Sequence, residues 1–319
     1  MAMPTGTFDT YAAKGLREDL ADIIYRIDPT DVPFTSNIGK SKASAKKHEW
    51  QVQNLASAVD DNEVIEGDDA SINNTIPTVR VGNFCQISDK VASVTGTMEA
   101  VDKAGRESEM EYQVLLKGLE LKRDVEKQML SNKPSNAGAS GTPARSASFE
   151  SWLTSNVSRG AGGANGGFNQ GTGLVSAPTD GTARAFTETL LKSVIASCFQ
   201  NGGKPTILML GPSQKQVFST FTGIAANRHE VDGTGQGVIV GAADVYVSDF
   251  GNLNVVPNLF QRNRTALLVD PRMAKLATLR PMKNWELAKT GDTEKRQILI
   301  EYALEVCNEA AHGVIADLT

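Results

Sequence analysis

Residues 108–130 read SEMEYQVLLKGLELKRDVEKQML. Their spacing predicts one uninterrupted helix of roughly 23 residues, about 35 Å long at 1.5 Å per residue. Ser108 and Glu111 form an S-x-x-E capping box at its start, and Pro134 follows its end. Apolar residues fill one side (Met110, Val114, Gly118, Leu121, Val125, Met129) and an adjoining side (Tyr112, Leu115, Leu116, Leu119, Leu130). Because this apolar surface is wide, we expect a spine helix that packs against more than one element.

Gly118 stands in the middle of this helix, in line with Val114, Leu121 and Val125. Glycine in a helix interior costs roughly 1 kcal/mol relative to alanine. We therefore expect another backbone to cross the helix closely at Gly118.

Composition narrows the class of protein. The chain has 319 residues, 40% of them hydrophobic and 22% charged, which is typical of a globular protein of about two domains. The net charge of −5 gives no sign of the basic surface that nucleic-acid binding requires. Three cysteines stand far apart, so we expect no disulfide and no zinc site but a reducing compartment. Residues 1–10 show no secretion signal, and no 18-residue apolar run predicts a membrane span.

Residues 1–45 are expected to form an N-terminal arm and not a compact domain. Leu16, Leu20, Ile23, Ile24 and Ile27 have the spacing of a short amphipathic helix. Pro29 and Pro33 keep the following chain extended. Two interpretations remain open: a frayed terminus, or an arm laid along a neighbouring subunit.

Residues 46–95 predict an extended two-stranded finger. Residues 46–55 alternate, with His48, Trp50 and Val52 on one face, and residues 78–87 form the second strand. About 20 polar and acidic residues join the two strands. An isolated hairpin is marginal in water, so the finger needs another surface to rest on.

The finger tip is acidic and its base is basic. The tip carries Asp60, Asp61, Glu63, Glu66, Asp68 and Asp69, and the base carries Lys40, Lys42, Lys46 and Lys47. Nine or ten strand residues span about 30 Å, beyond the Debye length of about 8 Å. We therefore expect the tip to meet basic residues of another subunit; a solvated loop is the alternative. The order of a calcium-binding loop is absent, so no metal site is expected.

The remaining chain divides into segments that differ in composition and hydrophobic pattern. Residues 131–184 are rich in Gly, Ser, Ala and Asn, which indicates a segment that is either disordered or shaped by its contacts. Residues 186–257 alternate between helices and short buried strands. Residues 285–288 and 298–308 predict strands of one antiparallel sheet, with Gly291 in the turn between them.

No pattern indicates a catalytic or cofactor site. Residues 233–237 read GTGQG, but the glycine spacing is wrong for a dinucleotide fingerprint and a predicted strand, 238–240, follows. His48, His229 and His312 lie too far apart for a local metal site. The sequence leaves open a spatial Cys–His pair, although no nucleophile motif surrounds any cysteine.

The order of these parts resembles the major capsid fold of tailed phages (Caudoviricetes) that is named after phage Hong Kong 97. Residues 32–39 (VPFTSNIG) followed by 48–51 (HEWQ) resemble the arm-to-finger segment of a large family of phage major capsid proteins. So do 248–251 (SDFG), 267–271 and the ending 288–292 (AKTGD) with Glu301. The resemblance covers nearly the whole chain in the same order.

This resemblance implies an α+β fold with a peripheral and an axial domain. Residues 1–45 would be the N-terminal arm, 46–95 the finger, 96–185 the spine helix and glycine-rich loop of the peripheral domain, 186–257 the axial domain, and 258–319 the returning strands of the peripheral domain. The family has no catalytic residues to carry over. No motif here matches the lysine–asparagine crosslink of some relatives.

The implied function is that of a shell subunit. Hexamers and pentamers of the chain would build the icosahedral head of a virion around double-stranded DNA, without sequence-specific binding and without a membrane. Portal, separate scaffolding and decoration proteins would be partners, and assembly would take place in the host bacterial cytoplasm. An encapsulin-like bacterial compartment shares the fold, but the long arm argues against it. An α/β enzyme is a third class, and the missing site residues argue against it.

Overall fold

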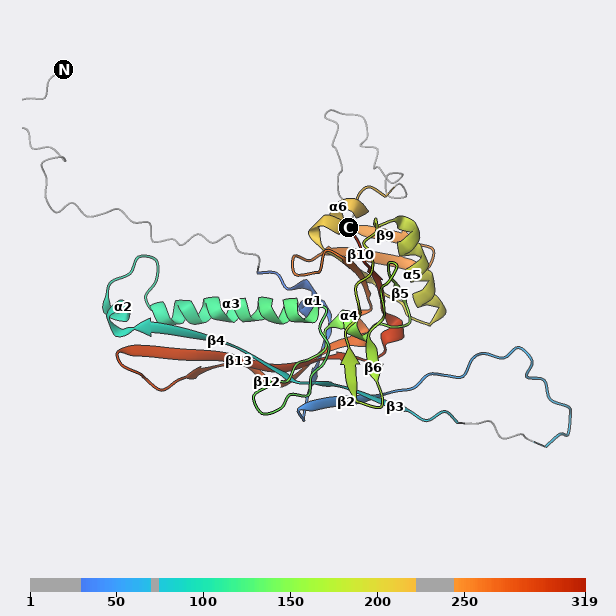
Figure 1. The fold of residues 1–319 in the computed structure, drawn as a ribbon, viewed down its shortest axis with the longest axis horizontal. Helices are drawn as coiled ribbons and strands as arrows, with labels where there is room; N and C mark the ends of the chain where they lie inside the picture. Colours follow the sequence, from blue (N-terminus) through green and yellow to red (C-terminus); the bar gives the residue numbers. More distant parts are fainter. Residues whose placement is uncertain (1–29, 70–74, 222–243) are drawn as a thin grey trace, which may run out of the picture.

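The computed structural model describes residues 30–69, 75–221 and 244–319. Figure 1 shows an elongated molecule: the spine helix lies along long strands, and a loop projects from the opposite end. A six-stranded sheet with its helices stands beside this long body. None of the described helices is long and apolar enough to cross a membrane.

The spine helix, α3, spans Glu109–Met129. The Ser108 hydroxyl accepts a hydrogen bond from the Glu111 N–H at 3.2 Å, as the sequence predicted. Glu99 of helix α2 (Gly96–Ala100) accepts from two further N–H groups, those of Glu109 and Met110, at 3.0 and 3.3 Å. A carboxylate at a helix N-terminus also favours the helix dipole.

The spine packs on a four-stranded sheet of order β1-β12-β13-β4. Its strands are Gly39–Lys42, Ala274–Glu286, Thr293–Val306 and Gln86–Thr95. The predicted antiparallel pair is confirmed, although the first strand begins at Ala274 and not at Trp285. Gly291 takes a φ of 68° in the turn. Leu121, Val125 and Met129 of α3 share one core with residues of β13, namely Ile298, Ile300 and Tyr302.

Only part of the predicted arm can be described. Residues 1–29, with their predicted helix, lie outside the described residues. Helix α1 (Pro33–Asn37) follows, and Phe34 and Ile38 are buried in the same core as α3. Strand β1 then pairs in parallel with β12. From Pro33 onward, therefore, the predicted arm is not a frayed terminus but packs on its own subunit.

The second sheet has the order β5-β14-β11-β8-β10-β9. Its strands are Val157–Ser158, Gly313–Ala316, Thr265–Val269, Ile207–Leu210, Gly251–Pro257 and Val245–Ser248, and α5 (Glu188–Gln200) and α6 (Pro212–Phe218) accompany it. Because β-strand side chains alternate, Ile207 and Met209 enter the core of the spine while Leu208 and Leu210 enter a second core with α5. The GTGQG segment and the predicted strand 238–240 lie outside the described residues.

Sheet membership does not follow the expected boundary at residue 258. Strands β11 and β14 come after this boundary but belong to the six-stranded sheet, while β12 and β13 belong to the four-stranded sheet with β4. The chain re-enters the four-stranded sheet at Ala274. Residues 258–319 are thus divided between both sheets.

The glycine-rich segment is shaped by its contacts. It contains α4 (Phe149–Trp152) and the short pair β6 (Gly167–Asn169) and β7 (Leu174–Ser176). A Cβ at Gly160 would lie 2.0 Å from the Thr182 carbonyl oxygen, and one at Gly166 would lie 2.2 Å from that of Ser176. Glycine is required at both positions because another backbone passes there.

Candidate inter-subunit surfaces

The finger is built on two short strands, β2 (Lys47–Val52) and β3 (Val79–Phe84). They pair antiparallel, with Lys47 opposite Phe84. The predicted inner face is confirmed: the Trp50 ring lies 5.3 Å from that of Trp152, which stacks on Phe168 at 5.9 Å. Each strand has 6 residues, so the paired part is shorter than the sequence predicted.

A buried carboxylate ties the finger base to the four-stranded sheet. Glu305 Oε2 accepts from the Ser41 hydroxyl at 2.6 Å and lies 3.0 Å from His48 Nε2. Lys275 Nζ lies 3.3 Å from Glu305 Oε1. Burial alone would raise the pKa of Glu305, but these donors hold the pKa below its ordinary value. The four residues join β1, β2, β12 and β13 at one point.

The cysteines are unsuited to nucleophilic chemistry. Burial raises the pKa of Cys85 to about 11 and that of Cys198 to about 12. Burial also raises the pKa of Cys307, whose sulfur lies 3.5 Å from Glu305 Oε1, on the carboxylate that His48 contacts. Reactive cysteines have lowered pKa values. These contacts give the Cys–His alternative no support.

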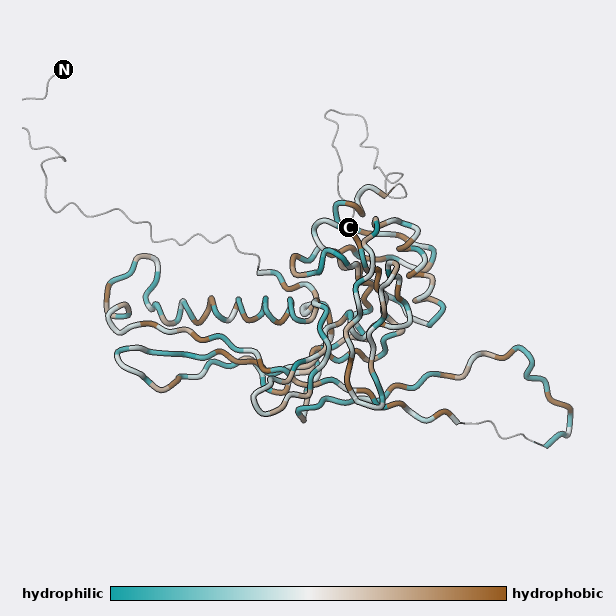
Figure 2. Tube along the Cα trace, in the orientation of Figure 1, coloured by the Kyte–Doolittle hydropathy of each residue, from teal (hydrophilic) through white to brown (hydrophobic). Residues whose placement is uncertain are grey.

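Beyond β2 the chain projects as a loop, the finger loop, whose described residues are 53–69 and 75–78. Leu55 is 97% exposed, Val64 84% and Ile65 79%. Figures 1 and 2 show this loop standing away from the body, with apolar and polar stretches along it. Within it, the Asp68 N–H donates to the Ile65 carbonyl at 3.1 Å, and Gly67 takes a φ of 85°. Exposed apolar residues of this kind mark an interaction surface.

The predicted acidic tip lies on this loop. Its members are all exposed: Asp60, Asp61, Glu63, Glu66, Asp68 and Asp69. Among ion pairs between described residues, none involves these carboxylates. Nor do any three described acidic, His or Cys residues gather as metal ligands. Among the described residues, the charge of the tip is therefore not neutralised.

The four lysines predicted at the base of the finger differ in their surroundings. Lys40 and Lys42 are exposed on β1, an edge strand of the four-stranded sheet, and Lys46 is exposed before β2. Lys47 differs, because its Nζ lies 2.9 Å from Glu49 Oε1 and 5.7 Å from the centre of the Phe84 ring. Three of the four lysines therefore remain available to another chain.

The expected backbone crossing at Gly118 is wrong within the described subunit. A Cβ built at Gly118 meets no described atom within 4 Å. The helix α3 is buried near both ends, at Met110 and at Leu121 and Val125. Gly118 lies between these buried parts.

Glu126, which no sequence pattern singled out, organises the start of the described chain. Its buried Oε1 accepts from the Phe34 N–H and the Asn258 side chain, both at 2.7 Å, and Oε2 accepts from the Thr35 N–H at 2.9 Å. Pro33 needs no donor partner as the first residue of α1, so Glu126 satisfies the next two N–H groups. One spine residue thus holds the arm's end and the residue after β10.

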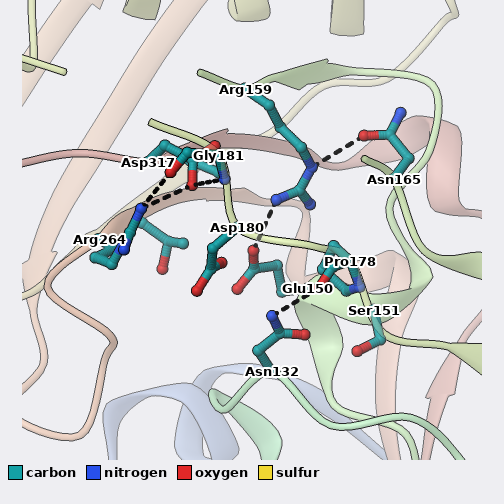
Figure 3. Close-up of polar contacts among 12 residues, drawn as sticks. Asn132, Glu150, Ser151, Arg159, Asn165, Pro178, Asp180, Gly181, Arg264 and Asp317 are labelled. Carbon is teal, nitrogen blue, oxygen red and sulfur yellow. Dashed lines mark hydrogen bonds and ion pairs between the residues drawn. The ribbon is translucent and has the colours of Figure 1, made fainter. Parts of the chain in front are cut away.

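A polar network joins the glycine-rich segment to the six-stranded sheet (Figure 3). Buried Glu150 lies 3.2 Å from Arg159 Nη1 and 2.6 Å from Arg262 Nη1. Asp317 accepts from the Gly160 N–H at 2.9 Å and lies 3.2 Å from Arg264 Nη2. Charges this buried are stable only when paired and hydrogen-bonded. The network fastens the glycine-rich segment to the strands of the six-stranded sheet.

A groove of about 790 Å³ lies between the finger base and the glycine-rich segment. Among the described residues lining it, Glu309 is the sole ionisable one. Its carboxylate accepts from the Thr154 and Ser155 N–H groups at 3.0 and 3.1 Å.

Comparison with known proteins agrees over the whole length of the chain. The family model described as the SU10 major capsid protein matches residues 3–319. A relative described as the major capsid protein of Escherichia phage Phieco32 is 27% identical over 345 residues, covering 99% of this chain and 97% of the relative.

Solved phage structures share the fold at low identity. That of Gordonia phage Cozz has a TM-score of 0.59 at 10% identity, covering 95% of this chain and 91% of its own. That of Microbacterium phage Oxtober96 has a TM-score of 0.59 at 11% identity, covering 95% and 96%. A phage G structure of gp27 major capsid proteins and gp26 decoration proteins has a TM-score of 0.55 at 10% identity, covering 100% of both chains. The Hong Kong 97 type of fold expected from the sequence is thereby confirmed, and the chain belongs to the SU10 major capsid protein family.

Proposed function

We propose that this major capsid protein assembles as hexamers and pentamers into an icosahedral head shell, and that its finger loop forms the contact with an adjacent subunit. The observation that carries the proposal is an apolar and acidic loop that stays exposed among the described residues of its own subunit. Membership of the family makes the chain a structural component of the virion and not an enzyme.

Apolar burial supplies most of the contact energy. Fully burying a Val, Leu or Ile side chain contributes about 1.5–3 kcal/mol. Leu55, Val64 and Ile65 are each more than three-quarters exposed and can gain most of this. A surface ion pair contributes only about 0–1 kcal/mol. The apolar residues therefore set the strength of the contact, and the carboxylates set its salt dependence.

The exposed lysines are the receptor that we assign to the acidic tip. Lys40, Lys42 and Lys46 of the adjacent subunit lie on or beside an exposed sheet edge. Lys47 belongs to the same group, but its pairing with Glu49 reduces its contribution to the contact with the acidic tip.

Other parts of the chain take the roles that the fold implies. The six-stranded sheet with α5 and α6 forms the axial domain, which meets its copies around the hexamer and pentamer axes. The shell encloses double-stranded DNA without reading its sequence, in keeping with a net charge of −5. Portal, separate scaffolding and decoration proteins complete the head, and assembly takes place in the host bacterial cytoplasm.

Two sets of variants test the finger contact. Val64→Ser with Ile65→Ser removes apolar contact, with Val64→Ile and Ile65→Val as the conservative control. Asparagine at Asp60, Asp61, Asp68 and Asp69 removes charge, with glutamate at the same four positions as its control. Sedimentation and electron microscopy across a salt series measure the yield of closed shells.

We expect the serine variant to yield folded subunits and few shells. The asparagine variant should form weaker shells whose stability depends less on salt, and the glutamate variant should match wild type. Closed shells of wild-type yield and wild-type salt dependence from both the serine and asparagine variants would show that the finger loop is merely solvated.

A further inference from the structure

The two strands of the finger form a sheet of their own. Among the described strands, β2 and β3 pair only with each other and with neither larger sheet. The chain enters the finger from β1 and leaves it into β4, and between these connections the side chains of the inner face hold the finger to the body. Opposite residues of an antiparallel pair lie on one face, so this inner face has three rungs. They are His48 with Asn83, Trp50 with Val81, and Val52 with Val79.

The first rung, His48 with Asn83, is polar. Asn83 is fully buried: its Nδ2 donates to the Leu304 carbonyl at 2.8 Å, and its Oδ1 accepts from the Ala147 N–H at 2.9 Å. His48 Nε2 lies 3.0 Å from Oε2 of Glu305, the next residue of β13. Hydrogen bonds tolerate only a narrow range of distances and angles. This rung therefore restricts the direction in which the finger leaves the body.

The second rung, Trp50 with Val81, is apolar. Both side chains pack against the core of the spine, and the Trp50 ring contacts that of Trp152. The Nε1 atoms of Trp50 and Trp152 are buried, and neither has a hydrogen-bond partner among the described residues. Apolar burial is non-directional. The second rung thus stabilises the finger on the body without fixing its angle.

The third rung, Val52 with Val79, borders the groove of about 790 Å³ and leaves Val79 41% exposed. Beyond it the finger loop projects from the body (Figure 1). An extended chain of ten residues spans about 33 Å, so a rotation of about 10° at the base displaces its far end by about 6 Å. A small change of angle at the first rung is therefore large where the loop would meet another subunit.

We propose that the His48–Asn83 rung positions the finger, and that its hydrogen bonds to β13 and Ala147 hold the finger loop at the angle that the contact with an adjacent subunit needs. Glu305 transmits this restraint to the sheet, because Ser41 of β1 and Lys275 of β12 also hold its carboxylate. The inference rests on the proposed function of the finger loop and names the residues that aim it.

Spin-label distances in the unassembled subunit test this positioning. One label stands on the finger loop at Leu55→Cys, and the other on helix α5 at Ser193→Cys, both exposed positions. The background is Cys307→Ser. The other two cysteines are buried, and a serine hydroxyl can take the place of the thiol that lies 3.5 Å from Glu305.

The variants separate the hydrogen bond from the packing of the ring. His48→Phe removes the bond to Glu305 and keeps a ring beside Trp50. His48→Gln keeps a donor and serves as the conservative rescue. Arg80→Gln is the matched control on the outer face of β3, where Arg80 is 69% exposed and pairs with Glu49.

We expect a distance distribution in His48→Phe at least roughly twice as wide as in wild type, because the lost hydrogen bond no longer restricts the angle. His48→Gln and Arg80→Gln should show the wild-type width. A wild-type width from His48→Phe would overturn the proposal. If this variant does not fold, His48→Ala, which is too small to clash, must show the same broadening.

The yield of closed shells, measured by electron microscopy, separates this inference from the proposed function. We expect His48→Phe to lower the yield and His48→Gln to restore it. A broad distribution combined with a wild-type yield would overturn the positioning role and leave the finger contact itself standing. A wild-type yield and salt dependence from the serine and asparagine variants of the finger loop would instead refute the contact, whatever the measured distances.

Discussion

Removing the carboxylate of Glu126 should uncouple the start of the described chain from the spine. Glu126→Ala leaves three donors without their acceptor: the N–H groups of Phe34 and Thr35 and the Asn258 amide. Glu126→Gln keeps the shape but places an amide NH₂ at one of the two oxygen positions. If its oxygen stays with Phe34 and Asn258, its nitrogen faces the Thr35 N–H, where two donors oppose each other.

The contacts set the expected magnitudes. An unsatisfied buried donor costs about 1–3 kcal/mol, and breaking a buried charged contact costs about 3–5 kcal/mol in total. Water that enters the vacated space relieves part of this cost. We therefore expect Glu126→Ala to lower the free energy of unfolding by about 3–5 kcal/mol. Glu126→Gln leaves mainly one donor without an acceptor and should lower the free energy of unfolding by about 1–3 kcal/mol.

Urea unfolding of unassembled subunits, followed by tryptophan fluorescence, measures these changes. Glu120→Gln is the matched control on the same helix, because Glu120 is 37% exposed and pairs with Lys117. A surface pair of this kind should contribute no more than about 1 kcal/mol. If Glu126→Ala cost no more than Glu120→Gln, the carboxylate would not hold α1, and the reasoning would be refuted.

Gly118→Ala should raise the free energy of unfolding by up to about 1 kcal/mol, because no described atom lies near its Cβ and alanine favours the helix; a loss of stability would reveal a contact that the described subunit does not contain. His312 should make the subunit acid-sensitive: burial lowers its pKa from 6.5 to about 4, its Nδ1 accepts from the Asp270 N–H, and its Nε2 lies 3.2 Å from the Met273 carbonyl. The unfolded chain binds this proton below pH 6.5 and the folded chain does not, so about 2–3 kcal/mol is lost between pH 6.5 and 4.5. His312→Gln should flatten this slope, and an unchanged slope would contradict the assignment.

Local patterns predicted much of the architecture. The helical spacing from Ser108 to Leu130 determined the spine, since periodicity and end signals act within a few residues. Alternation around Trp50 predicted the inner face of the finger, and the Gly291 turn predicted the long hairpin. The exposure of the acidic tip was also predicted, because carboxylates with no basic partner nearby in the sequence are expected to stay in solvent.

Other features depend on residues distant in sequence. Glu126 reads as a polar helix residue, and only the approach of α1 and Asn258 makes it a buried acceptor. Lys47 looked equivalent to Lys46 until the pairing with Glu49 separated them. Gly118 suggested that another backbone crosses the helix closely, but a glycine in a helix does not show whether another segment packs against it.

The sequence by itself determined where helices and strands form and which faces are apolar, because backbone propensity and side-chain period are local properties. Only the tertiary structure decided that β11 and β14 join the six-stranded sheet while β12 and β13 join the spine. Strand pairing depends on which edges and apolar faces meet, and these are supplied by segments up to hundreds of residues apart. For the same reason, it was the fold that left the finger loop exposed among the described residues.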